Sequence, residues 1–241
     1  MSHEWTLCPQ TIERPVILGR ATSLDPRVVV AYRVAEHQAM GTRYGKFLRE
    51  RYIQDVFAFQ TGNCRNIDGS TPATPGKHSE HAHWHTVDIR PPVNPVHNDG
   101  VLTCEFDKFG LDDGVQFMRA FLHDGWFRWG GTWSSSLAKA REALARNGQQ
   151  ISTGKVDPMH FELALSPQQL GAAIKLTLTG VNRGVAVRCW KTRLKRLGFL
   201  TTNISTEFDA DTAEATKAFQ RAKNLRVNGT VDRDTWAAAF A

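Results

Sequence analysis

The sequence lacks any run of about 18–20 consecutive apolar residues, the length that a membrane-spanning helix needs. Its first residues, Met-Ser-His-Glu-Trp-Thr, also lack the basic stretch followed by an apolar run that is typical of a secretory leader. These absences argue against membrane insertion and predict a chain that is made and held in the cytoplasm. A substrate outside the membrane would then require a separate route of release.

Cysteine is scarce, and no Cys-x-x-Cys pair occurs. The four cysteines are Cys8, Cys64, Cys104 and Cys189. Such scatter is typical neither of a disulfide framework nor of a cysteine-based zinc site. We therefore expect all four cysteines to be reduced.

Acidic residues are outnumbered by basic ones. The 241 residues carry a formal net charge of +6, the pI is near 9.3, and the hydrophobic content of 41% supports an ordinary packed core. A basic balance favours polyanionic partners, namely nucleic acid, anionic membranes or an acidic cell envelope. No base-reading motif is recognisable, so a nucleic-acid partner is a rival hypothesis that rests on charge alone.

Histidine and aspartate are concentrated in two separated stretches. The first reads Ser79-Glu-His81-Ala-His83-Trp-His85-Thr-Val-Asp88, and the second reads Asp157-Pro-Met-His160-Phe-Glu162. Imidazole and carboxylate together suit zinc, and a catalytic zinc needs three protein ligands and one open position for water. His81, Asp88 and His160 can supply the three ligands, and Asp157 can act as the base beside the water.

The spacing resembles a known family. Ser-x-His-x6-Asp followed by Asp-x-x-His-Phe-Glu, with Trp129-Gly-Gly-Thr132-Trp133 before it, is similar to the zinc D-Ala-D-Ala carboxypeptidases and L-alanyl-D-glutamate endopeptidases of peptidoglycan, in the branch found in phage endolysins. The resemblance covers roughly residues 55–165 and implies His81 as the ligand in preference to His83 or His85, which we expect to be surface or cleft-lining histidines. Departures are Trp84 for the family's glycine, Thr86 for its small alanine, and Thr132 for its aspartate.

Further site residues follow from the same resemblance. In that family an arginine after the first strand binds a carboxylate of the substrate. Arg65 is the residue that corresponds best to this arginine, although it could equally be a solvated loop residue. We expect Glu162 to orient a ligand imidazole, with Ser79 flanking the metal stretch. Trp129 and Trp133 are expected to line a cleft, the alternative being plain core.

Residues 183–241 have a different character, with a basic excess and three amphipathic helical stretches. Their pattern resembles the small peptidoglycan-binding domain, on the motifs Leu194-x2-Leu197-Gly-Phe, Phe208-x3-Thr212-x2-Ala215, Ala218-Phe-Gln and Gly229-Thr-Val-Asp232-x2-Thr235-Trp236. Its basic residues form either a solvated face or contacts to envelope anions.

Together these features predict an α+β protein of two domains. Residues 1–178 would form a zinc peptidase domain with a small antiparallel sheet and flanking helices, and residues 183–241 a three-helix peptidoglycan-binding domain. The predicted function is a monomeric zinc-dependent peptidoglycan hydrolase, most simply an L-alanyl-D-glutamate endopeptidase acting as an endolysin. The alternatives are a D-Ala-D-Ala carboxypeptidase and a non-catalytic wall-binding protein whose metal site has decayed.

Overall fold

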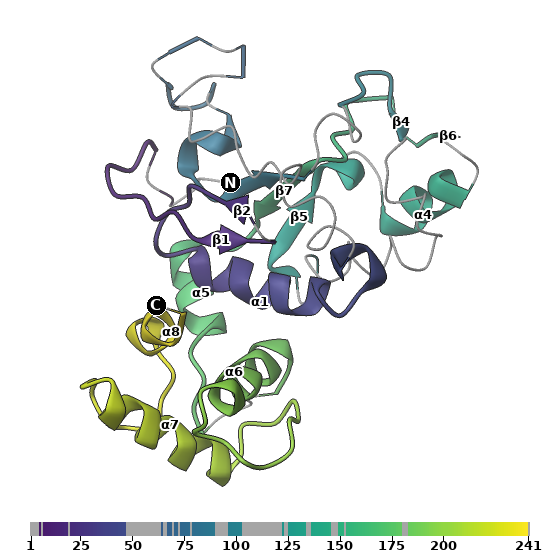
Figure 1. Cartoon of the computed structure of the whole chain (residues 1–241). Helices are drawn as coiled ribbons and strands as arrows, with labels where there is room; N and C mark the ends of the chain where they lie inside the picture. Colours follow the sequence, from purple (N-terminus) through teal and green to yellow (C-terminus); the bar gives the residue numbers. More distant parts are fainter. Residues whose placement is uncertain are drawn as a thin grey trace. The chain divides into compact units, whose positions relative to one another are not determined.

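The computed structural model divides into two compact units, Met1–Ser166 and Pro167–Ala241, which are described separately (Figure 1). The residues that the structure describes are 5, 7–18, 20–46, 64, 67–68, 70–71, 73–77, 79–89, 96–102, 122, 125–133, 136–145, 149–151, 153–179 and 183–240. The sequence also predicts a strand at 56–59 and a helix at 106–125. Arg65, that strand and most of that helix lie outside the described residues.

The first unit is built on an antiparallel sheet of three short strands in the order β3-β7-β5. These strands are β3 (Thr86–Asp88), β7 (His160–Leu163) and β5 (Phe127–Trp129). The central strand β7 has a strand on each side, and all four of its residues are buried. The mixture of helices with this small antiparallel sheet is the α+β class that the sequence predicts.

Helix α1 (Val29–Ala39) packs on this sheet through its apolar stripe. The Tyr32 hydroxyl donates to the carbonyl oxygens of His85 (2.8 Å) and Phe161 (3.2 Å), which connects the helix to β7 and to the residue before β3. The sequence predicts one helix from about 27 to 51, but α1 ends at Ala39. Thr42 interrupts it, since its hydroxyl donates to Ala39 O and accepts from Gly45 N.

The remaining elements in the described part of this unit are short. They are the β1 (Val16–Ile17) and β2 (Arg20–Ala21) hairpin, the 3-10 turns η1 (Glu80–His83) and η4 (Gly130–Thr132), helix α4 (Leu137–Ala145), and the pair β4 (Val101–Leu102) and β6 (Gln149–Gln150).

The second unit contains helices α5 (Pro167–Ala173), α6 (Val185–Arg196), α7 (Ala210–Ala222) and α8 (Arg233–Phe240) (Figure 1). Trp190, Phe219 and Trp236 form its core, with the Trp190 ring edge-on to both of the others. Aromatic rings prefer this edge-to-face geometry because the positive ring edge meets the negative face.

The boundary between the units falls earlier than the sequence suggests. Residues 167–178, which we assign from the sequence to the first domain, belong to the second unit. The Trp236 indole donates to Ile174 O at 2.8 Å, and Leu176 pairs with Val231, so the segment closes over the C-terminal helices.

The expectation of four reduced cysteines is wrong for one pair. Cys8 and Cys64 form a disulfide across a sequence separation of 56, while Cys189 is buried and outside any disulfide. Two cysteines so far apart give no pattern in the sequence, and only the fold brings them together. Among the helices described, none is long and apolar enough to span a membrane.

Candidate metal centre

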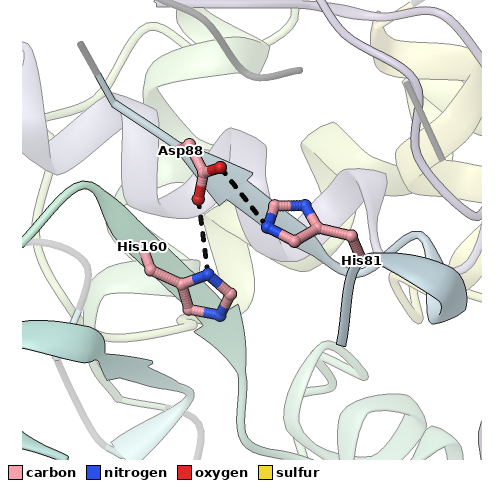
Figure 2. A group of neighbouring side chains, drawn as sticks. All are labelled: His81, Asp88 and His160. Carbon is pink, nitrogen blue, oxygen red and sulfur yellow. Dashed lines mark ion pairs between the residues drawn. The ribbon is translucent and has the colours of Figure 1, made fainter. Parts of the chain in front are cut away.

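The pairing of β3 with β7 unites the two histidine-rich stretches. In this antiparallel register Asp88 lies directly opposite His160, because Thr86 pairs with Glu162 at the other end. Directly opposite residues on one face of a sheet have adjacent side chains. The His160 Nδ1 atom therefore lies 3.3 Å from Asp88 Oδ1 (Figure 2).

His81 reaches the same point from η1. Its Nε2 atom lies 3.3 Å from Asp88 Oδ2, and Figure 2 shows the two imidazoles on either side of the carboxylate. One ligand atom from each of His81, Asp88 and His160 lies within 4.8 Å of the other two. This is the set that the sequence indicates, and two imidazoles with one carboxylate form a metal-binding triad of the kind that zinc accepts.

Trp84 ends η1 in the left-handed conformation, with φ 57° and ψ 30°. The backbone turns there from η1 toward β3, in a conformation that glycine adopts most readily. A tryptophan in this conformation costs about 1 kcal/mol or more. The chain nevertheless keeps the turn, so the substitution does not displace His81 from the triad.

Within the triad, Asp88 and His160 shift each other's pKa values. Burial alone would raise the pKa of Asp88, but His160 and His81 outweigh it and hold that pKa well below its usual range. For His160, burial would lower the pKa, yet the Asp88 and Glu162 carboxylates raise it to about 9. Two carboxylates thus surround a histidine that is almost completely buried, an arrangement that attracts a cation.

Glu162 holds the other side of the His160 ring. Its Oε2 atom lies 3.2 Å from His160 Nε2, and its Oε1 atom is bound by Arg128 Nη2 at 2.8 Å. A ligating histidine commonly donates its second ring N–H to a carboxylate, which fixes the tautomer and the ring orientation. His160 would therefore present Nδ1 to a metal and Nε2–H to Glu162.

Asp157 lies on the tight turn that precedes β7. The His160 amide donates to Asp157 O at 3.1 Å, and the Asp157 amide donates to Gly130 O at 3.0 Å. Gly130 is required for this approach, since a Cβ there would lie 2.3 Å from Asp157 O. The Asp157 side chain is buried, and among the described residues its Oδ1 atom has no hydrogen-bond partner. Burial raises the pKa of this carboxyl, which suits a proton acceptor.

The two other histidines of the first stretch have structural contacts instead. His85 is fully buried, lies 3.3 Å from Glu80 through Nε2, and stacks on the Trp5 ring at 5.7 Å. His83 is also buried and packs against the His85 ring. The expectation that these are surface or cleft-lining residues is therefore wrong, because η1 turns them into the interior while His81 meets Asp88.

The remaining expected site residues are placed as follows. Ser79 precedes η1 as its N-cap position, without a side-chain cap. Trp129 is fully buried and donates to Pro158 O at 2.7 Å, so it supports the Asp157 turn and belongs to the core. Trp133 is 38% exposed, and its ring lies edge-on to His160 with the centroids 4.8 Å apart. Arg65 lies outside the described residues.

Two cations near the site are missed by the sequence reasoning. Arg128 pairs with Glu162 across the sheet, in the register that also pairs Trp129 with Phe161. Lys155 lies 3.5 Å from Asp157 Oδ2. The alternation of Phe127-Arg-Trp129 could have indicated a strand with an outward arginine, but nothing in the sequence names its partner.

Comparison with known proteins identifies the second unit. Residues 183–239 match the peptidoglycan-binding domain family. The chain therefore carries a peptidoglycan-binding domain, which associates it with the cell wall and with peptidoglycan as a partner.

A CtpA-like serine protease of Staphylococcus saprophyticus is 45% identical to this chain over 49 residues. The match covers 20% of this chain and only 10% of that protein. No solved structure matches the chain. The family match lies entirely in the second unit and does not include the three residues of the triad.

Proposed function

We propose that this protein is a zinc-dependent peptidoglycan hydrolase that cleaves an amide bond of the stem peptide. The observation that carries the proposal is the meeting of His81, Asp88 and His160 within 4.8 Å, with the buried carboxylate of Asp157 close enough to interact electrostatically with His160 and Asp88. The cleavage we favour is that of an L-alanyl-D-glutamate endopeptidase, on the resemblance of the Asp157-x-x-His160-Phe-Glu162 stretch. The D-Ala-D-Ala carboxypeptidase reaction is the alternative within the same chemistry.

The residues present fit a zinc ion. Two imidazole nitrogens and one carboxylate oxygen converge, and these three donors would hold a zinc ion while leaving it open to solvent. A bound zinc ion would supply Lewis acidity toward the scissile carbonyl and lower the pKa of a coordinated water toward ~7. Glu162 and Arg128 would keep the His160 ring in the orientation that binding needs.

Asp157 would move the proton. Its carboxylate accepts a proton from the attacking water as the water oxygen bonds to the carbonyl carbon. It then delivers that proton to the leaving nitrogen as the C–N bond breaks, so that one water is consumed and an acid and an amine are formed. The raised pKa of Asp157 favours both steps, because a group that acts first as a base and then as an acid is most effective when its pKa approaches the working pH.

The peptidoglycan-binding domain would tether the catalytic unit to its polymer. Linkage of this kind raises the effective concentration of substrate without new contacts in the site. The disulfide between Cys8 and Cys64 fits a place of action outside the reducing cytosol. We propose that the chain is held in the host cytoplasm and acts at the wall after release, as an endolysin does.

The test uses the purified full chain and purified peptidoglycan. Zinc-loaded protein should release fragments that mass spectrometry assigns to one peptide bond, and a chelator should abolish the release until zinc is restored. Asp157→Asn should keep the zinc content and lose at least about a hundredfold in rate, in line with loss of a general base.

A matched control is Asp68→Asn, an exposed loop carboxylate whose loss should leave the rate unchanged. A fully active Asp157→Asn protein would exclude Asp157 as the base. Wall binding without any cleavage by the zinc-loaded protein would favour the non-catalytic wall-binding alternative. Salt-sensitive binding to DNA in place of peptidoglycan would favour the nucleic-acid rival.

A further inference from the structure

Lys155 and Trp133 are exposed side chains that lie next to the buried residues Asp157 and His160. The Lys155 Nζ atom lies 3.5 Å from Asp157 Oδ2 and 5.3 Å from the centroid of the Trp133 ring. The Trp133 ring in turn lies edge-on to His160 at 4.8 Å. The ammonium group thus contacts the proposed base on one side and, through the tryptophan, borders a metal ligand on the other.

Lys155 and Trp133 are more exposed to solvent than the residues that they contact. The side chain of Lys155 is 47% exposed and that of Asp157 only 7%. Trp133 is 38% exposed, whereas His160 is buried. A substrate that approaches Asp157 and His160 from solvent would therefore meet the lysine and the tryptophan.

The backbone beside both residues is anchored by hydrogen bonds. Val156 is fully buried and exchanges two hydrogen bonds with His97, at 2.9 and 2.8 Å, so Lys155 lies beside an anchored residue. The Trp133 amide donates to Gly130 O, and the Thr132 hydroxyl donates to Trp129 O at 2.9 Å. A positioned cation beside an aromatic face has the character of a binding site, because neither group has to be ordered when a ligand arrives.

The charge of Lys155 is only partly used. An ammonium group has three donors, and within the described part of the chain Lys155 has one ion-pair partner, Asp157, at 3.5 Å. Arg128, the other cation of the group, is already bound to Glu162 at 2.8 Å. Lys155 can therefore donate hydrogen bonds to an anionic group that arrives from solvent, while its aliphatic part remains against the tryptophan.

We infer that Lys155 and Trp133 form a subsite for a carboxylate that lies next to the scissile amide. The inference rests on the proposed function, and it names the group that would be recognised. In a stem peptide whose glutamyl residue is linked through its side chain, the α-carboxylate remains free beside the nitrogen of the bond that is cut. Lys155 would bind that carboxylate, and the Trp133 face would contact the adjoining peptide atoms.

The experiment compares two synthetic stem peptides that differ only in that group, one with the α-carboxylate and one with a carboxamide. The zinc-loaded wild type should show a KM about tenfold lower for the carboxylate peptide, the size of a charge-assisted hydrogen bond. Lys155→Met should remove this difference by raising the KM for the carboxylate peptide alone. Lys155→Arg should preserve the difference, and Lys155→Glu should reverse it.

Lys139→Met provides the matched control, because this lysine is exposed on α4. Its discrimination between the peptides should equal that of the wild type. If Lys155→Met still discriminates, the subsite does not exist. If that variant instead lowers kcat equally for both peptides at unchanged KM, Lys155 serves only to position Asp157, and the inference is overturned.

Failure of the proposed function would look different. In that case the wild type cleaves neither peptide, and the subsite is tested by binding alone, with zinc-loaded Asp157→Asn protein titrated with each peptide. A tenfold preference for the carboxylate peptide that Lys155→Met abolishes would support the subsite without cleavage. Equal affinities for the two peptides would refute it.

Discussion

Removal of the Cys8–Cys64 disulfide should destabilise the first unit substantially. The bond connects the N-terminal arm to the segment that leads into the metal-binding stretch, across a sequence separation of 56. The arm also contacts that stretch directly, because the Cys8 amide donates to Ala82 O at 2.9 Å and Trp5 stacks on His85. Ala82 lies next to His81, so the bond restrains the backbone beside the proposed metal site.

The magnitude follows from the length of the closed loop. For a loop of about 56 residues, the chain-entropy model assigns about 4 kcal/mol to the loss of freedom that the bond imposes on the unfolded chain. Single domains are stable by only about 5–15 kcal/mol in total. For a unit of this size, a loss of 4 kcal/mol should lower Tm by roughly 10 °C.

The assay is calorimetry of oxidised wild type and the Cys8→Ala/Cys64→Ala variant, with and without a reductant. Unreduced peptide mapping by mass spectrometry should first find the Cys8 and Cys64 peptides linked in the wild type. The variant should then unfold about 10 °C lower, and the reductant should bring the wild type down to the variant's Tm. A difference below about 1 kcal/mol, or one that persists under reductant, would refute the reasoning.

Four further predictions concern the metal site and the binding domain. Glu162→Gln should weaken zinc binding about 10–100-fold, measured by competition with a chelator, because the carboxylate that orients His160 is lost; unchanged affinity would contradict this role. Zinc affinity should also rise with pH between 6 and 8, since His160 has a pKa of about 9 without metal and protons compete with the ion below that value; a flat profile would exclude His160 as a ligand. Gly130→Ala should lower Tm and activity together, because the new Cβ would lie 2.3 Å from Asp157 O; a variant as stable and active as the wild type would show that the turn can relax. The pKa of Asp209 in the binding domain is lowered to about 2, because its hydrogen-bonded neighbours outweigh the effect of burial. Its contribution to stability is therefore present above about pH 4 and is lost as the pH falls toward 2. Asp209→Asn should keep the helix cap but flatten this part of the curve of stability against pH, and identical curves for the variant and the wild type would refute the prediction.

The sequence by itself determined the identity of the chemical groups. The pattern of His81, Asp88 and His160 names a zinc-type ligand set, because imidazole and carboxylate are the donors that such an ion accepts. The C-terminal motifs, among them Phe208-x3-Thr212-x2-Ala215 and Gly229-Thr-Val-Asp232, likewise indicate the peptidoglycan-binding domain, and the family match over residues 183–239 agrees with them. These conclusions depend on residue type and on spacing within short motifs, and both can be read directly from the sequence.

The tertiary structure decided which of these groups meet and which are buried. The register that places Asp88 opposite His160 depends on pairing between distant strands, and a slip of one residue would turn every side chain to the other face. His81, His83 and His85 are equivalent by type, yet the η1 turn aims one at Asp88 and buries the other two. The Cys8–Cys64 bond, the Arg128–Glu162 pair and the contact of Lys155 with Asp157 also join residues whose local patterns do not refer to each other. Their partners are set by the packing of the whole unit, which minimises the free energy over contacts that no short stretch of sequence contains.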